Sequence, residues 1–201
     1  MIGISGIAGA GKDLFCRLLL KNGIKGHRIA LADQLKEELR PFIMRKYDID
    51  ITNCSLEQKD RVRDLLVFYG GLKRFQTQGK YWTDIAQEKA KRCKGTPVVT
   101  DVRYDDFEND EVSWVKSDNS GVLIHIRKYW EVDDLFERQR LYFDPPNEDE
   151  KRNDPKLISK ADYLIEWPHI EDAKTKDIEK ALLPFVKEFI KWYKGKNKNV
   201  L

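Results

Sequence analysis

The chain has 201 residues, of which 41% are hydrophobic and 35% are charged, with 37 Lys and Arg against 34 Asp and Glu. This length suits one domain with a substantial core, and a net charge of +3 on scattered basic residues does not indicate nucleic-acid binding. No apolar run is long enough for a membrane span, so we expect neither a membrane nor a nucleic-acid partner. Three widely spaced cysteines suggest neither a disulfide framework nor a zinc site, which favours a reducing cytoplasm.

The first element is a predicted strand at residues 2–5, which leaves no room for a targeting peptide. It leads into a glycine-rich turn, Gly-Ile-Ala-Gly-Ala-Gly-Lys (6–12), followed by apolar residues at helical spacing. Glycines let the backbone N–H groups point into one concavity at the start of a helix, where an anion binds. We therefore predict a nucleotide phosphate loop rather than an ordinary strand-to-helix turn, formed by Gly6, Ala8, Gly9, Ala10, Gly11, Lys12 and Asp13.

Lys12 supplies a positive charge suited to the β- and γ-phosphates of a nucleotide. The next position of this motif normally holds Ser or Thr, whose hydroxyl helps to bind Mg²⁺, and here it holds Asp13. Taken alone, the loop predicts only that a nucleotide binds.

The rest of the chain alternates strand and helix signals. Further strands are predicted at residues 28–31, 97–100, 122–126 and 163–165, which indicates an α/β fold with a central, mostly parallel five-stranded sheet. Ser55 and Gln58 form a capping box, and apolar residues from Val62 to Leu72 continue one helical face. In the last helix, Pro184 is expected to introduce a kink or mark a boundary.

Ligands of an open α/β sheet bind at the carboxyl ends of its strands, so the residues that follow each strand are candidates. Asp101 could orient Mg²⁺ or its water, or it could cap a helix. Arg103 offers a planar fork suited to phosphate oxygens. Asp33 and Lys36 follow the second strand and are explained equally well as a capping residue and a solvated lysine.

Several arginines allow two interpretations. Arg63 and Arg74 are either surface partners of nearby aspartates or phosphate ligands. Arg138, Arg140 and Arg152 lie in a charged segment that could be a phosphoryl-transfer lid or an ordinary charged loop. The three histidines are better explained as structural residues than as catalysts.

Several of these stretches together resemble one family. The chain resembles a deoxynucleoside monophosphate kinase of the bacteriophage type, within the P-loop nucleoside monophosphate kinases. The matching stretches run in the family's order: Gly-Ile-Ala-Gly-Ala-Gly-Lys-Asp (6–13), Ala-Asp-Gln-Leu-Lys (32–36), Arg-Asp-Leu-Leu-Val-Phe-Tyr-Gly (63–70) with Arg74 and Tyr-Trp (81–82), Thr-Asp-Val-Arg-Tyr (100–104) and Lys-Ala-Asp-Tyr-Leu-Ile (160–165). Asp is tolerated after the loop lysine in this family, so Asp13 supports the resemblance.

The resemblance implies a P-loop kinase fold in a single domain, 1–201. Its core would comprise about 1–32, 95–127 and 161–193, with an acceptor-binding insertion at about 33–94 and a lid at about 128–160. The resemblance further implies an acceptor site made by Asp33, Lys36, Arg63, Tyr69, Arg74, Trp82 and Arg103. Catalytic roles fall to Lys12, Asp13, Asp101, Arg138 and Arg140, with Mg²⁺ or its waters near Asp13 and Asp101.

The reaction that we expect is ATP-dependent phosphorylation of a nucleoside monophosphate, with a deoxynucleotide preferred, to the diphosphate. The protein would be a monomer or homodimer in the cytoplasm, that of the host if the chain is of phage origin. Lid closure would exclude water, the competing acceptor. Two alternatives stay open: a kinase of another phosphorylated metabolite, resembling animal phosphomevalonate kinase, and a nucleotide-binding module that has lost catalysis.

Overall fold

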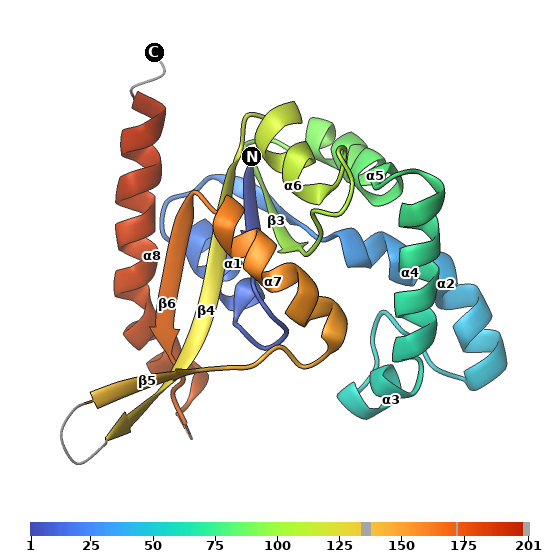
Figure 1. Cartoon of the computed structure of the whole chain (residues 1–201), viewed down its shortest axis with the longest axis horizontal. Coiled ribbons are helices and arrows are strands. Elements are labelled where there is room, and N and C mark those ends of the chain that lie inside the picture. The colour runs from blue at the N-terminus through green and yellow to red at the C-terminus, as the bar shows by residue number, and fades with distance from the viewer. Residues whose placement is uncertain (134–137, 172, 199–201) are drawn as a thin grey trace.

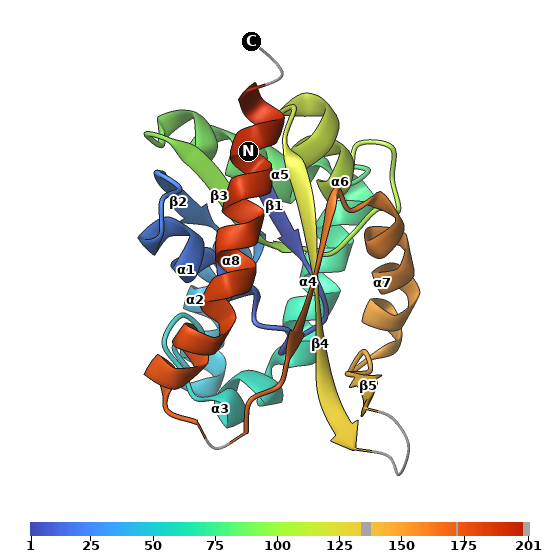
Figure 2. The ribbon, with the colours of Figure 1, turned by 90° about the vertical axis from the view of Figure 1, so that its left-hand side faces the viewer.

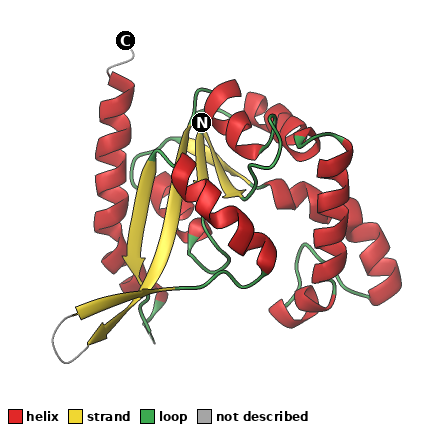
Figure 3. Cartoon of the chain, viewed as in Figure 1, coloured by secondary structure: helices red, strands yellow, loops and turns green. Residues whose placement is uncertain are grey.

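A computed structural model describes residues 1–133, 138–171 and 173–198 and contains a sheet between layers of helices (Figures 1 and 3). Five parallel strands lie in the order β2 (Gly26–Ile29), β3 (Thr96–Val102), β1 (Ile2–Ser5), β4 (Val122–Asp133) and β6 (Tyr163–Pro168). The predicted mostly parallel sheet is therefore confirmed. The sequence did not predict β5 (Arg138–Tyr142), which pairs antiparallel with the second half of β4.

Different helices cover the two faces of the sheet, because successive side chains of a strand point to opposite faces. Helices α1 (Lys12–Lys21) and α8 (Thr175–Lys198) pack on the face that carries Ile124. Helices α5 (Lys80–Arg92) and α7 (Glu148–Lys160) pack on the face that carries Leu123. Figure 2 shows α8 and α7 on opposite sides of the sheet.

The segment between β2 and β3 is built from α2 (Leu31–Tyr47), α3 (Leu56–Arg61), α4 (Arg63–Gln76) and α5. The first three share a small core of their own, made by Leu39, Ile43, Ile49, Ile51, Val62 and Leu66. The predicted capping box of Ser55 and Gln58 begins α3. The expectation of one continuous apolar helix was wrong, because the backbone leaves the helical conformation at Val62 (φ −115°, ψ 7°), whose side chain is buried in this core.

Helix α8 continues through Pro184, where the sequence predicts a kink or a boundary. Pro184 lies on the exposed side of the helix, so water can bind the carbonyl group that has lost its partner. Leu182, Val186 and Phe189 are buried on the other side, and this packing keeps the helix in place. A short helix, α6 (Glu111–Ser113), and one π turn, Trp114–Asp118, lead into β4.

Within the described ranges, no helix combines the length and the apolar character that crossing a membrane requires.

Candidate active site

The predicted phosphate loop connects β1 to α1, and two of its glycines are required by its geometry. Gly6 has a φ of 136°, and a Cβ there would lie 2.5 Å from the carbonyl oxygen of Ile126. Gly11 has a φ of 94°, and a Cβ there would lie 2.6 Å from the ring of Trp167. The indole N–H of Trp167 also donates to the carbonyl of Ala10 over 2.9 Å, so β6 supports the loop from outside.

Lys12 is 9% exposed and turns back over the loop. Its Nζ donates to the carbonyl groups of Gly6 (2.6 Å) and Ile7 (2.8 Å). Burial, together with the charge of Arg103, lowers the pKa of Lys12 to about 8. The ammonium group is therefore mostly charged at neutral pH, and it is held by carbonyl groups that a phosphate can replace.

A carboxylate from a distant segment binds the same loop. Glu150, in the first turn of α7, accepts a hydrogen bond from the backbone N–H of Ala8 over 2.6 Å, although the two residues are 142 positions apart. Its other oxygen lies 3.7 Å from Nη1 of Arg103, and its side chain is only 13% exposed. The Ala8 amide belongs to the set that a phosphate loop offers to an anion. Glu150 therefore occupies part of the anion site.

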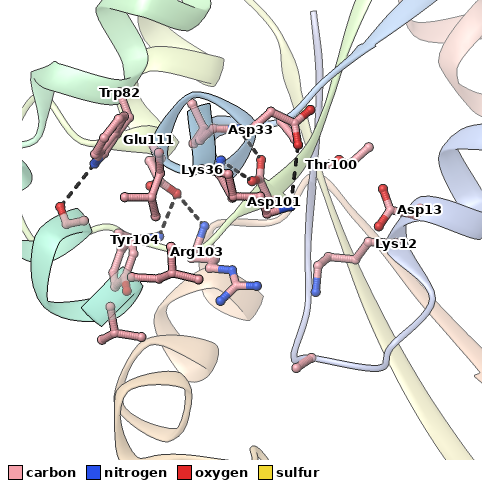
Figure 4. Close-up of a pocket in the computed structure, with 18 of the residues that line it drawn as sticks. Lys12, Asp13, Asp33, Lys36, Trp82, Thr100, Asp101, Arg103, Tyr104 and Glu111 are labelled. Atoms are coloured by element: carbon pink, nitrogen blue, oxygen red, sulfur yellow. Dashed lines mark hydrogen bonds and ion pairs between the residues drawn. The ribbon is translucent and has the colours of Figure 1, made fainter. Parts of the chain in front are cut away.

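The loop forms one wall of a cavity of about 500 Å³, whose other walls come from α2, α4, α5, β3 and the segment after β3. Figure 4 shows Lys12 and Asp13 at one end, with Trp82, Tyr104 and Glu111 at the other. Most of the predicted site residues line this cavity: Ala8, Gly9, Gly11, Lys12, Asp13, Asp33, Lys36, Arg63, Arg74, Trp82, Asp101 and Arg103.

Cations crowd the middle of the cavity. Burial and the charges of Lys36, Arg63 and Arg103 lower the pKa of Lys59, which also lines the cavity. Cations this close repel one another, and an anion placed among them relieves the repulsion. Lys36, Arg63 and Arg103 already have acidic neighbours in Asp33, Asp60 and Glu150, so a phosphate bound here would replace carboxylates as their partner.

Arg28, which the sequence did not single out, neutralises two of the predicted acidic residues. Its Nε donates to Asp13 and its Nη1 donates to Asp33, each over 2.9 Å. Lys36 lies 3.8 Å from the second of these carboxylates. Asp13 and Asp33 therefore face the cavity as parts of ion pairs rather than as free carboxylates.

Asp101, at the carboxyl end of β3, caps a helix with both carboxylate oxygens. They accept hydrogen bonds from the backbone N–H groups of Leu31 and Ala32, at the start of α2, each over 2.8 Å. Burial raises the pKa of Asp101, and these two bonds oppose the shift. Asp101 therefore caps a helix from about 70 positions away, whereas the alternative from the sequence was a helix that starts at Asp101 itself. In the part of the chain that the structure describes, no group of three or more His, Cys, Asp or Glu side chains is arranged to hold a metal ion.

Buried charges form the end of the cavity away from the loop. Arg74 is 7% exposed, pairs with the fully buried Asp110, and has its guanidinium carbon 3.5 Å from the ring centroid of Tyr104. Trp82 is buried beside them and donates its indole N–H to the carbonyl of Gly70 over 3.1 Å. This end is therefore flat, aromatic and rigid.

Glu111 closes this end of the cavity and is 4% exposed. Its Oε2 accepts hydrogen bonds from the backbone N–H groups of Arg103 (2.6 Å) and Tyr104 (3.2 Å). Burial and the neighbouring Asp110 raise the pKa of Glu111 to about 8. The sequence analysis missed this residue, because a glutamate in a charged stretch gives no sign that folding will bury it.

Tyr69 and two predicted lid arginines, Arg140 and Arg152, do not line the cavity. The hydroxyl of Tyr69 donates to Glu38 over 3.1 Å, and Tyr69 does not appear among the described residues that line the cavity. The predicted lid begins as the β4–β5 hairpin, which Figure 1 shows extending away from the body of the molecule. Arg140 lies on this hairpin, over the ring of Tyr129 and 3.3 Å from Glu166.

Of the other predicted lid arginines, only Arg152 has a described side chain. The side chain of Arg138 lies outside the described residues. Arg152, on α7, pairs with Asp149 over 2.7 Å and lies 3.8 Å from Asp106. Residues 128–160 therefore contribute Glu150 to the phosphate loop, whereas the structure brings neither Arg140 nor Arg152 to the cavity wall.

Comparison of the sequence with protein-family models and with curated proteins gave no match. Among solved structures, the chain is similar to shikimate kinase from Acinetobacter baumannii in complex with shikimate (12% identity, 93% of this chain and 92% of that chain, TM-score 0.43). It is also similar to shikimate kinase from Aquifex aeolicus (14%, 93% and 95%, 0.42) and to dephospho-CoA kinase from Campylobacter jejuni (15%, 96% and 98%, 0.42). Similarity at this level assigns no activity to the chain.

Proposed function

We propose that the protein transfers the γ-phosphoryl group of ATP to the phosphate of a nucleoside monophosphate, preferably a deoxynucleotide. The observation that carries this proposal is one cavity that joins the phosphate loop to a second group of cations and then to an aromatic end. A donor nucleotide and a phosphorylated acceptor need two neighbouring phosphate sites. The flat surfaces of Trp82 and Tyr104 suit a nucleobase.

In the proposed reaction, the loop amides and Lys12 hold the β- and γ-phosphates. Arg63 and Arg103 hold the acceptor phosphate, one of whose oxygens attacks the γ-phosphorus atom. The bond from that phosphorus to the bridging oxygen breaks, and ADP leaves with the electron pair while the acceptor becomes a diphosphate. Lys12 and the two arginines offset the negative charge of the transferring group.

The acidic residues fit a Mg²⁺ ion that takes most of its ligands from the nucleotide and water, as Mg²⁺ usually does. Asp13 would hold the hydrated ion through Oδ2, because its Oδ1 accepts a hydrogen bond from Arg28. Asp101 would contribute only through lone pairs that the amides of α2 do not use. When bound, Mg²⁺ would offset charge on the β- and γ-phosphates.

A kinase of another phosphorylated metabolite is the second candidate. Lys36, Arg63 and Arg103 suit the phosphate of any acceptor, whatever its organic part. The aromatic end of the cavity favours the nucleotide over an aliphatic acceptor.

The test measures ADP release from ATP with a panel of ribo- and deoxynucleoside monophosphates and with phosphomevalonate. We expect turnover with at least one nucleoside monophosphate, reduced at least about 100-fold by Lys12→Ala. Lys21→Ala is the matched control, because Lys21 lies on the same helix, is exposed and contacts only Glu179 among the described charged groups. Turnover with phosphomevalonate alone supports the second candidate, and ATP binding without turnover of any acceptor contradicts both.

A further inference from the structure

The two ends of the cavity differ, and this difference determines how a bound acceptor would be oriented. Transfer requires the acceptor phosphate next to the γ-phosphate, and therefore near Lys12. Figure 4 shows Trp82, Tyr104 and Glu111 on the opposite side of Arg103 from Lys12. If the proposed function holds, on which this inference rests, the base of the acceptor extends toward these three residues.

Glu111 holds a fixed orientation at this end. Both backbone bonds, from Arg103 and Tyr104, go to Oε2. Oε1 accepts no hydrogen bond from any residue in the described ranges, and it is not one of the fully buried atoms that lack a partner. Because Glu111 lines the cavity, this oxygen is open to water there, and a ligand that displaces the water must supply a matching polar group.

We propose that Oε1 of Glu111 makes the hydrogen bond that recognises the base of the acceptor nucleotide, which makes Glu111 a specificity-determining residue. Arg74 lines the same end of the cavity, where its guanidinium group pairs with Asp110 and stacks on Tyr104. A site that offers a hydrogen bond to a substrate discriminates against analogues without the matching group by at least about tenfold.

Whether Oε1 donates or accepts this hydrogen bond depends on the ionisation of the Glu111 carboxyl group. Because Oε2 accepts two N–H groups, the proton of the neutral carboxyl group lies on Oε1, which then donates into the cavity. Once ionised, Oε1 can only accept. Burial is the largest cause of the raised pKa of Glu111. Among the charged groups, Asp110 and Asp101 raise this pKa further, and Arg74 lowers it. Ionisation at about pH 8 therefore reverses the group that the base meets.

Glu111→Gln tests the proposal, because an amide oxygen can keep both backbone bonds while the NH₂ group donates at every pH. We would compare kcat/KM for dAMP and for the purine deoxynucleotide that lacks its 6-amino group at about pH 6.5 and about pH 9, where neither base ionises. Only dAMP offers an amino N–H to the ionised carboxylate, whereas both bases offer ring nitrogens to the neutral carboxyl group. Deoxyribose 5-phosphate, which has no base, serves as a competitive inhibitor. Glu38→Gln is the matched control, since Glu38 binds Tyr69 and Tyr81 outside the cavity wall.

In the unsubstituted protein and in the control, the ratio of kcat/KM for the two nucleotides should change about tenfold between the two pH values. In Glu111→Gln the ratio should stay constant, with the inhibition constant of deoxyribose 5-phosphate unchanged. Equal pH dependence with and without the substitution overturns the proposal, and so does a parallel loss of affinity for the base-free inhibitor, which marks a structural role. Absence of turnover with every nucleoside monophosphate contradicts the proposed function instead.

Discussion

Removing the charge of Glu150 should tighten ATP binding. Its carboxylate accepts the Ala8 N–H and lies near Arg103, so a nucleotide phosphate must displace it. A hydrogen bond to a charged group contributes about 1.5–3 kcal/mol and a neutral one about 0.5–1.5 kcal/mol. Glu150→Gln keeps the neutral bond, so the competing contact weakens by about 1 kcal/mol. That difference corresponds to an ATP dissociation constant about fivefold lower.

The assay is calorimetric titration of ATP in the absence of acceptor. Glu148→Gln is the control, because Glu148 lies in the same first turn of α7, is exposed and pairs only with Lys151 among the described residues. This control removes the same charge at a similar distance along the helix, so it reports the general electrostatic effect. An unchanged or weaker affinity in Glu150→Gln, relative to Glu148→Gln, would show that the carboxylate does not compete with the nucleotide.

Three further outcomes follow from the same site. ATP affinity should fall as pH rises through about 8, because the pKa of Lys12 is lowered to about 8, and titrations in two buffers of different ionisation enthalpy should detect proton uptake there. The free energy of unfolding should fall by up to about 1.4 kcal/mol per pH unit between about pH 5 and about pH 8, because the pKa of Glu111 is raised to about 8 only in the folded state; urea unfolding of the protein and of Glu111→Gln measures the difference. Gly11→Ala should lower the free energy of unfolding by about 1–3 kcal/mol, because of its positive φ and the Trp167 ring, whereas Gly71→Ala, with open space around the new Cβ, should not.

Each of these three expectations can be contradicted by a specific result. Constant ATP affinity up to about pH 9 would mean that Lys12 keeps its proton without a phosphate partner. The same pH slope of stability in Glu111→Gln would assign that slope to other groups. Equal stability of the two glycine variants would show that the loop relaxes away from Trp167.

Local signals were enough to predict the first strand and the glycine turn that follows it. The strand at Ile2–Ser5 and the glycine turn depend on neighbouring residues, and the structure contains both as predicted. The second strand was predicted at 28–31 but spans Gly26–Ile29, because Leu31 already begins α2. The cap that starts this helix is Asp101, about 70 positions away. A contact of that range leaves no periodic pattern in the sequence.

The difference between local signals and long-range contacts also explains which site residues could be predicted. Arg103 was predicted because a strand end is a local position, and it lines the cavity. Tyr69 was assigned to the site through the family resemblance, but its hydroxyl binds Glu38, since α2 supplies a carboxylate within reach. Glu111 and Glu150 gain their importance from burial and from contacts across the fold, which charge patterning in the sequence does not reveal.

Asp101 ties the start of α2 to the sheet. Its two hydrogen bonds hold the first amides of this helix at the strand end that also leads to Arg103. Further along α2, Glu38 accepts a hydrogen bond from Tyr81 of α5, a helix that packs on the sheet. Lys36 lies between these two attachments, so its position relative to Arg103 is set by the sheet and not by a hinge in the helix.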